Sequence, residues 1–187
     1  MILLSKKFYI SDLHIGHKNI LKFDQRPFFD LEEMKQTIIN NWNSVVSPYD
    51  DVYILGDMFW NNDEAADVLS KLKGRLYLIK GNHDRENAEI RMWFDWIKNY
   101  AEIHDNGRNV VLCHYPIAHW HNADHGTIHL YGHIHAGRDS RPFEEYVKMM
   151  KKRDTPYYCY NVGCMLPYMD YTPRTLDEII NGTKENK

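Results

Sequence analysis

Residues 8–14 read FYISDLH, so an apolar run, Phe8–Ile10, passes directly into Asp12 and His14. The run is short, aromatic and β-branched and ends in polar residues, which is typical of a buried strand. Five further runs of this kind follow along the chain: Val52–Leu55, Leu76–Ile79, Val110–Cys113, Ile128–Tyr131 and Tyr157–Tyr160. All six runs end in polar or glycine residues, and the sequence therefore predicts short strands ended by turns.

Helices are predicted between the early strands. Asp30 can cap a helix, with Glu33 in the capping-box position, and apolar residues then recur at helical spacing up to Val45. The tryptophans Trp42, Trp93 and Trp96 also stand at helical spacing and are expected in the core. Shorter helical patterns occur at residues 65–72, at residues 90–97, from Pro142 onward and from the capping-box segment Thr175–Glu178.

The alternation of strands and helices predicts an α/β fold with parallel pairing. Strands follow one another more closely between Asn109 and Gly163, which indicates a mixed or second sheet. We expect a single domain over residues 1–187, with residues 182–187 as a frayed tail.

Composition narrows the class of protein. The 187 residues include 23 basic and 26 acidic side chains, a net charge of −3, so there is no global basic field for nucleic acid. The three cysteines form no CxxC pair, which favours a reducing cytosol over a disulfide framework. Neither a signal peptide nor an apolar stretch of about 18 residues is evident, and a cytoplasmic protein without membrane contact is expected. The number of histidines is unusual: the chain has 11, and eight of them lie between His104 and His135.

Polar clusters follow the first five strands at the point where each strand ends. They are Ser11–His14, Gly56–Asp57, Gly81–Asp84, His114–Pro116 and Gly132–His135. Because the carboxyl ends of strands in an α/β sheet converge, these clusters can meet at one point. Asp12 and His14 of the first cluster stand two residues apart, as do His133 and His135 of the last, which puts both side chains of each pair on one side of an extended segment.

The ligand types indicate metal chemistry. Imidazole, carboxylate and amide oxygen suit divalent first-row metals such as Mn, Fe, Zn or Co. The number of ligands exceeds the three or four of one zinc site, and two metals that share a carboxylate explain it better. Two-metal sites with ions about 3.5–4 Å apart are suited to phosphoester hydrolysis.

The order D-x-H, G-D, G-N-H-D, H and G-H-x-H resembles the calcineurin-like metallophosphoesterase superfamily over nearly the whole chain. The opening Asp12–His17 is most similar to its small bacterial and phage-type members. The resemblance implies a four-layer αββα sandwich with two mixed β-sheets flanked by helices. It also implies a metal-dependent phosphoesterase with two divalent metal ions, for which Mn, Fe, Zn and Ni all remain open.

The resemblance further implies a role for each motif residue. One metal is expected on Asp12, His14 and His135, the other on Asn82, His114 and His133, with Asp57 bridging the two. A metal-bridging hydroxide would attack phosphorus, while His83 would steady the transition state and protonate the leaving oxygen. Asp84 is expected to keep His83 oriented and protonated. The motif glycines Gly56, Gly81 and Gly132 are expected to serve tight turns.

Four further residues are predicted as substrate contacts, each with a structural alternative. His17 could instead belong to a helix start, and Arg26 could be a surface residue rather than a phosphate clamp. His119 and His121, with His125, could overhang the metals or form a polar loop anchored by Trp120. His129 is expected to be structural and His104 solvated. The basic run Lys148, Lys151, Lys152 and Arg153 is expected to be a solvated helix end rather than a nucleic-acid contact.

A phosphodiesterase is favoured over a monoesterase, with a small phosphoester or nucleotide-like substrate. Two alternatives stay open: a non-catalytic protein-interaction scaffold on the same fold, and a nuclease that acts on short nucleic acid. All eight motif positions carry suitable residues, which argues against the scaffold. Long nucleic acid is not expected as a partner. Exposed tyrosine and tryptophan would support a homodimer, and the sequence leaves the oligomeric state open.

Overall fold

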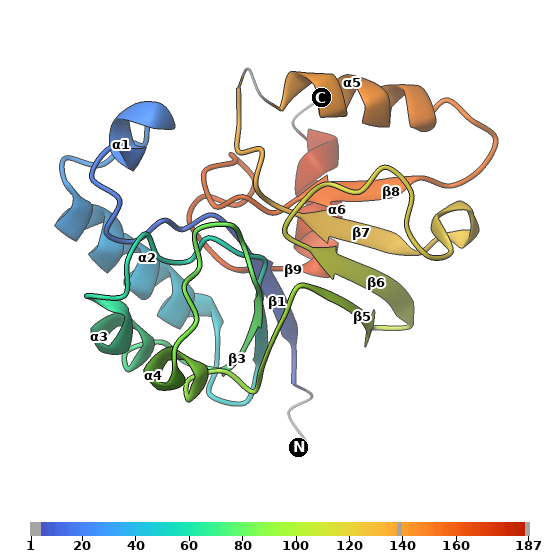
Figure 1. Ribbon diagram of the computed structural model, residues 1–187. Helices are drawn as coiled ribbons and strands as arrows, with labels where there is room; N and C mark the ends of the chain where they lie inside the picture. The colour runs from blue at the N-terminus through green and yellow to red at the C-terminus, as the bar shows by residue number, and fades with distance from the viewer. Residues whose placement is uncertain (1–4, 138–139, 186–187) are drawn as a thin grey trace.

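The computed structural model describes residues 5–137 and 140–185, and its strands form two mixed sheets (Figure 1). The first sheet has the order β4-β3-β2-β1-β9, and the second has the order β5-β6-β7-β8. In the first sheet β1 to β4 are parallel and β9 is antiparallel to β1. In the second, β6, β7 and β8 are parallel and β5 is antiparallel to β6. The strands are β1 Lys7–Ile10, β2 Asp51–Ile54, β3 Arg75–Ile79, β4 Trp96–Lys98, β5 Tyr100–Asp105, β6 Arg108–Cys113, β7 Ile128–Tyr131, β8 Tyr158–Asn161 and β9 Arg174–Thr175.

Helices cover the outer faces of both sheets, which completes the predicted αββα arrangement (Figure 1). The helices α2, α3 and α4 connect successive parallel strands of the first sheet and therefore lie on one face of it. The helix α5 packs on the second sheet. Their bounds, with those of the remaining helices, are α1 Ile20–Phe23, α2 Leu31–Val45, α3 Ala65–Leu69, α4 Ala88–Arg91, the 3-10 helix Ala123–His125, α5 Arg141–Met150 and α6 Leu176–Glu185.

The second sheet packs on both of its faces because side chains alternate along its strands. Val110 and Leu112 of β6 belong to the large core that they share with the first sheet. Val111, between them, points to the opposite face and packs in a smaller cluster with Val147 and Met150 of α5. Because successive strand side chains face opposite sides, one short apolar run supplies both interfaces.

Local capping signals fix the two helices that the sequence predicts most directly. The Asp30 carboxylate accepts a hydrogen bond from the Glu33 backbone N–H at 2.8 Å, as expected for the start of α2. At α6 the Glu178 carboxylate accepts from the Thr175 N–H at 2.8 Å. The helix α6 continues to Glu185, so residues 182–185 of the segment expected to fray are helical, and residues 186–187 lie outside the described residues.

The predicted helix over residues 90–97 is wrong. The helix α4 ends at Arg91, and Trp96–Lys98 forms strand β4 beside β3. The Asp95 N–H donates to the Leu76 carbonyl at 2.9 Å, so pairing with an existing sheet edge outweighs the helical spacing of the apolar residues. Consequently Trp93 is 36% exposed, whereas Trp42 is fully buried as predicted. Within the described residues, no helix is both long and apolar enough to cross a membrane.

Candidate metal centre

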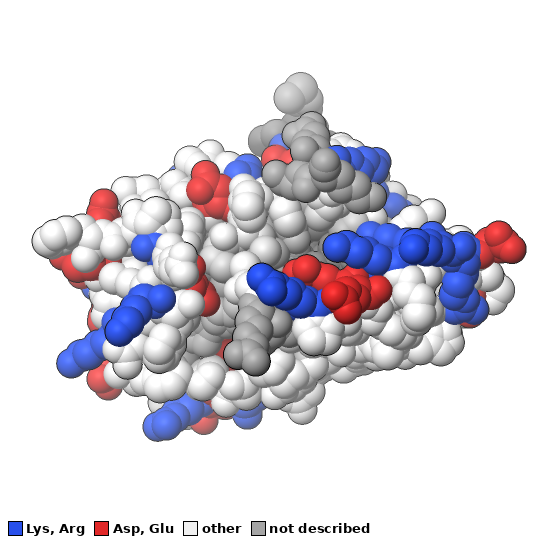
Figure 2. Space-filling model, turned by 90° about the horizontal axis from the view of Figure 1, so that it is seen from above, with Lys and Arg blue, Asp and Glu red and all other residues white. Residues whose placement is uncertain are grey.

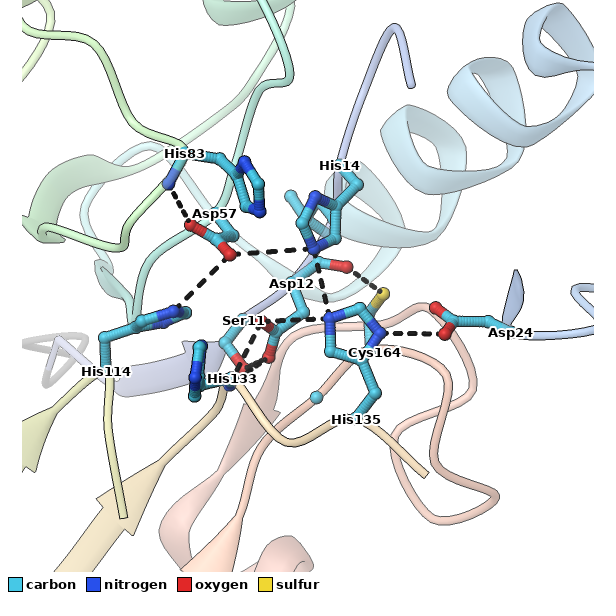
Figure 3. A network of polar contacts seen from close by, with 12 residues as sticks. Ser11, Asp12, His14, Asp24, Asp57, His83, His114, His133, His135 and Cys164 are labelled. Carbon is cyan, nitrogen blue, oxygen red and sulfur yellow. Dashed lines mark hydrogen bonds and ion pairs between the residues drawn. The ribbon is translucent and has the colours of Figure 1, made fainter. Parts of the chain in front are cut away.

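The five polar clusters meet where the carboxyl ends of both sheets face each other (Figure 3). Two groups of side chains form there: Asp12, His14 and His135 in one, and Asp57, His114 and His133 in the other. In each group the candidate ligand atoms lie within 4.8 Å of one another. Each group takes residues from the first sheet and from the second, because Asp12, His14 and Asp57 follow β1 and β2 while the other three follow β6 and β7.

The backbone at five of these six residues is left-handed. The φ angles of Asp12, His14, Asp57, His133 and His135 are 57°, 50°, 54°, 71° and 45°. Such conformations cost about 1–3 kcal/mol each for residues with a side chain and persist only where surrounding contacts enforce them. Here the contacts include hydrogen bonds from the Asp12 N–H to the Gly56 carbonyl at 3.0 Å and from the His14 N–H to the Asp57 carbonyl at 2.9 Å. The strand ends therefore hold one another in the turns that aim the ligands inward.

Two motif glycines are required for space rather than for a turn. A Cβ on Gly81 would lie 2.2 Å from Oδ1 of Asp57, and one on Gly132 would lie 2.4 Å from Oδ2 of Asp12. Gly56 alone of the three has a left-handed φ, of 91°. The expectation of a tight turn thus holds for Gly56, whereas Gly81 and Gly132 let a carboxylate approach the neighbouring backbone.

The first group holds facing acceptor atoms that call for a cation. Asp12 is fully buried, and its carboxylate accepts from the Ser11 hydroxyl at 2.6 Å and from the His133 N–H at 3.1 Å. Nε2 of His14 lies 3.1 Å from Nε2 of His135, which is 3.6 Å from Oδ1 of Asp12. Burial lowers the pKa of His14 to about 3, so its ring is neutral at pH 7. Two facing imidazole nitrogens share at most one proton, whereas a divalent cation accepts electron pairs from both and from the carboxylate.

The second group shows the same pattern. The Nδ1 atom of His114 lies 2.7 Å from the Leu55 carbonyl, to which it donates, leaving Nε2 as an acceptor directed into the site. That Nε2 lies 3.1 Å from Oδ1 of Asn82 and 3.4 Å from Oδ2 of Asp57. Three acceptors therefore surround one point. The alternative to a cation at this point is a proton on Nε2: burial works to raise the pKa of Asp57, but the hydrogen bond and charge of a protonated His114 outweigh it and hold that pKa at about 2.

Asp57 lies between the two groups. Its Oδ2 is 3.4 Å from Nε2 of His114 and 3.7 Å from Nε2 of His14, while its Oδ1 accepts from the His83 backbone N–H at 2.9 Å. This carboxylate is the group that can contact a cation on either side. The donor set and its placement fit two divalent metal ions.

Asp24 was not predicted from the sequence, yet it orients a candidate ligand. Its Oδ1 accepts from Nδ1 of His135 at 2.8 Å, which directs Nε2 of that ring toward Asp12. Such a carboxylate behind a ligating histidine fixes the tautomer and ring orientation. The only sequence signal for it is the short spacing to Arg26, which does not reveal the His135 contact.

The predicted substrate contact of Arg26 is wrong. The residue is 5% exposed, and its guanidinium donates to the Leu13 and Asp12 carbonyls at 2.8 Å each. It also donates to the Asp24 carboxylate at 3.0 and 2.8 Å. These contacts occupy the guanidinium, so Arg26 supports the loop after β1 from behind instead of reaching a phosphate.

Asp84 has different partners from those expected. Its carboxylate accepts from the backbone N–H groups of Asp57, Met58 and Gly81 at 2.8, 3.0 and 2.8 Å. No bond to the His83 ring occurs among the hydrogen bonds of residues 5–137 and 140–185. Asp84 thus ties the loop after β2 to the loop after β3, and it acts on His83 only through that backbone.

An open cleft of about 670 Å³ lies over the centre. The His83 ring lines it and stands 5.4 Å from the His14 ring. His17 also lines it, in the place predicted for a substrate contact. Phe23 and Trp60 line the cleft as well and were not predicted. The sequence signal that could have pointed to Trp60 is its position three residues after Asp57, in the loop that follows a strand and carries a predicted ligand.

A family model for the calcineurin-like phosphoesterase superfamily domain matches residues 6–175. The chain belongs to this superfamily.

Its relatives extend from archaea to phages. The chain is 33% identical over 188 residues to an uncharacterized protein of Methanocaldococcus jannaschii. The aligned region covers 98% of this chain and 94% of that relative. The chain is 31% identical over 164 residues to the Gene 66 protein of Mycobacterium phage L5, covering 71% of this chain and 79% of the phage protein. Among solved structures, a protein of unknown function from Aquifex aeolicus is similar with a TM-score of 0.72 and 25% identity, covering 95% of this chain and 99% of that one.

Two histidines predicted as substrate contacts lie elsewhere in this superfamily member. His119 and His121 are exposed, and neither is among the described residues that line the cleft. Nδ1 of His121 lies 2.8 Å from the Glu102 carboxylate of β5. The loop is held instead by Trp120, whose indole N–H donates to the Thr127 carbonyl at 2.9 Å. The structure therefore fits the alternative interpretation of this segment, a polar loop anchored by Trp120.

The structure agrees with the burial expected for His129 and with the exposure expected for His104 and the basic run. His129 is fully buried in β7, where its Nε2 accepts from the Ile117 N–H at 3.1 Å, and His104 is exposed. Lys148, Lys152 and Arg153 are exposed at and beyond the end of α5. Figure 2 shows Lys and Arg side chains gathered in one band over this helix. None of the described residues of this band is among those that line the cleft over the candidate metal centre.

Proposed function

We propose that this chain is a two-metal phosphoester hydrolase that acts on small phosphodiesters in preference to monoesters. The observation that carries the proposal is the pair of Asp/His groups with Asp57 between them. Superfamily membership gives the reaction class, and the facing acceptor atoms give a reason why both groups need a cation.

The residues that would hold the first ion are Asp12, His14 and His135, and those for the second are Asn82, His114 and His133. Asp57 would contact both. When bound, such a pair of ions lowers the pKa of a water molecule and offsets the negative charge of the phosphate. The chain itself supplies orientation, because Leu55, Asp24 and Ser11 fix His114, His135 and Asp12 before any substrate arrives.

We assign protonation of the leaving oxygen to His83. Its backbone N–H is held by Oδ1 of Asp57, and its ring lines the cleft 5.4 Å from the His14 ring. The backbone of His83 is therefore anchored to the same carboxylate that lies between the two groups, while its ring reaches the space a substrate would occupy. A general acid in this position assists departure of an alkoxide.

The walls of the cleft favour a small substrate of low charge. Among the described residues that line it, none is lysine or arginine. A phosphodiester carries one negative charge where a monoester carries up to two, so it depends less on cationic side chains. Long nucleic acid is bound through many Lys and Arg contacts to phosphates, and the lining described here does not offer them.

The test is a metal-by-substrate screen on the purified protein. The protein is analysed for bound metal, loaded with Mn, Fe, Zn or Ni, and assayed on bis-p-nitrophenyl phosphate, p-nitrophenyl phosphate and a nucleotide panel. Hydrolysis that is lost in Asp57→Asn and in His83→Ala, with both variants still folded by circular dichroism, supports the proposal. Metal-loaded protein that hydrolyses none of these esters would overturn it, and protein that binds no metal even after Mn soaking would favour an interaction scaffold.

A further inference from the structure

Aromatic rings form a continuous surface from the rim of the cleft to His83. The Phe23 ring lies 5.8 Å from that of His17, whose centroid is 3.8 Å from that of Trp60. Trp60 in turn lies 4.6 Å from His83. All four residues line the same cleft as the ligand histidines. We refer to Phe23, His17 and Trp60 as the aromatic platform.

The loop after β2 fixes the direction of Trp60. Phe59 pairs with Ile15 in an isolated parallel bridge and is buried. The Trp60 N–H donates to the Ile15 carbonyl at 2.9 Å, so the pairing of β1 with β2 continues past the end of the sheet. Since neighbouring residues in an extended segment face opposite sides, burial of Phe59 directs Trp60 toward the cleft. The same extension carries Asp57, and the platform is therefore held in register with the metal centre.

His17 completes a fixed rather than an adaptable surface. Its Nδ1 accepts from the Asn19 backbone N–H at 3.1 Å, and the residue is only 8% exposed. By contrast, Trp60 is 39% exposed and Phe23 is 68% exposed. Large exposed apolar side chains beside a polar site commonly mark a surface that binds a ligand.

The aromatic platform offers contacts to a substrate that do not depend on cationic side chains. No lysine or arginine of the described residues lines the cleft, so the part of a substrate beyond its phosphate has ring surfaces and the Ile20, Ile134 and Ala136 side chains to contact. Stacking on an aromatic side chain binds planar rings without a charge partner and with little dependence on the identity of the ring.

We propose that the aromatic platform stacks a planar aromatic group of the phosphate-ester substrate, with Trp60 as the main contact. This inference rests on the proposed function, because it takes the phosphate to lie at the metal centre. A nucleobase and an aryl ester share the required chemistry. The contact lies on the side of the cleft that carries His83.

The experiment measures binding by isothermal titration calorimetry on Mn-loaded protein, independently of turnover. Two pairs of monoesters, the product type of diester hydrolysis, differ in the ring: adenosine 5′-monophosphate against ribose 5-phosphate, and phenyl phosphate against ethyl phosphate. We expect the ring-bearing ligand of at least one pair to bind about 5- to 150-fold more tightly. The pair that shows the preference identifies a nucleobase or an aryl group as the source.

Three variants assign the preference to Trp60. In Trp60→Ala the affinity ratio within the preferred pair falls to near one, and Trp60→Phe retains part of it. Trp93→Ala is the matched control, because Trp93 is 36% exposed and does not line the cleft; it keeps the wild-type ratio. The ratio cancels any general loss of phosphate affinity, and thermal unfolding by circular dichroism checks that each variant is folded.

The results separate this inference from the proposed function. Equal affinities within both pairs, or a preference that survives Trp60→Ala, would overturn the platform even if the protein hydrolyses diesters. A preference that depends on Trp60, in a protein that hydrolyses no ester, would support the platform as a binding site while the hydrolase proposal fails.

Discussion

Replacing Arg26 tests whether this residue supports the metal centre or contacts substrate. The Arg26→Leu substitution removes a guanidinium that donates to the Asp12 and Leu13 carbonyls and to the Asp24 carboxylate. The Arg26 side chain is 0% exposed and that of Asp24 is 7% exposed, so the variant leaves a buried carboxylate without its cation. Breaking a buried ion pair on one side costs about 3–5 kcal/mol of stability. For a chain of this size that corresponds to a fall in Tm of about 6–20 °C.

The assay pairs thermal and urea unfolding with kinetics at saturating metal. We expect a large loss of stability, weaker metal binding because Asp24 no longer holds His135 as firmly, and a KM near the wild-type value. Arg153→Leu is a suitable control, since Arg153 is 48% exposed and its ion pair with Asp124 is 3.7 Å long; its stability should change by no more than about 0.5 kcal/mol. Wild-type stability in Arg26→Leu together with a raised KM would refute the reasoning and restore the phosphate-clamp interpretation.

Two further substitutions test other parts of the structure. Gly132→Ala places a Cβ 2.4 Å from both Oδ2 of Asp12 and Oγ of Ser11, so calorimetric titration should show strongly reduced metal binding; unchanged affinity would mean that the backbone yields without moving the carboxylate. Burial lowers the pKa of His129 to about 4, so the unfolded state binds the extra proton below pH 6.5 and stability falls as the pH drops toward 4. Between pH 7 and pH 5 this amounts to about 2 kcal/mol. His129→Gln should reduce the difference in urea stability between these two pH values by that amount, and an unaltered difference would locate the acid sensitivity elsewhere.

The strands and the ligand clusters were predictable because one local pattern carried both. A short apolar run such as Phe8–Ile10 is a strand signal by itself, and the polar residues behind it mark the end at which loops converge. Side-chain chemistry then restricted what such a convergence could bind. The prediction failed where an edge strand competed with a helix: residues 90–97 have helical spacing, but the edge of β3 offers Trp96 hydrogen bonds that sequence periodicity does not register.

Contacts between side chains far apart in the sequence were the harder part. Nothing near Arg26 shows that its donors are taken by backbone carbonyls, and nothing near Asp84 shows that three backbone N–H groups surround it. His121 has the residue type of a pocket ligand, but Glu102 on a neighbouring strand fixes it elsewhere. Residue type constrains what a side chain can do, whereas its partner depends on tertiary packing.

The division of both ligand groups between two sheets has a consequence for folding. His14 and His135 are 121 residues apart, and His14 follows strand β1 of the first sheet while His135 follows strand β7 of the second. Any cation bound there would be a cross-link between the two halves of the chain, closing a long loop whose ordering costs entropy. Binding free energy at such a site is also folding free energy. Removing such a cation with a chelator should therefore weaken the packing between the two sheets. Amide hydrogen exchange in β1 and β7 should become faster, which can be measured without an assay of catalysis.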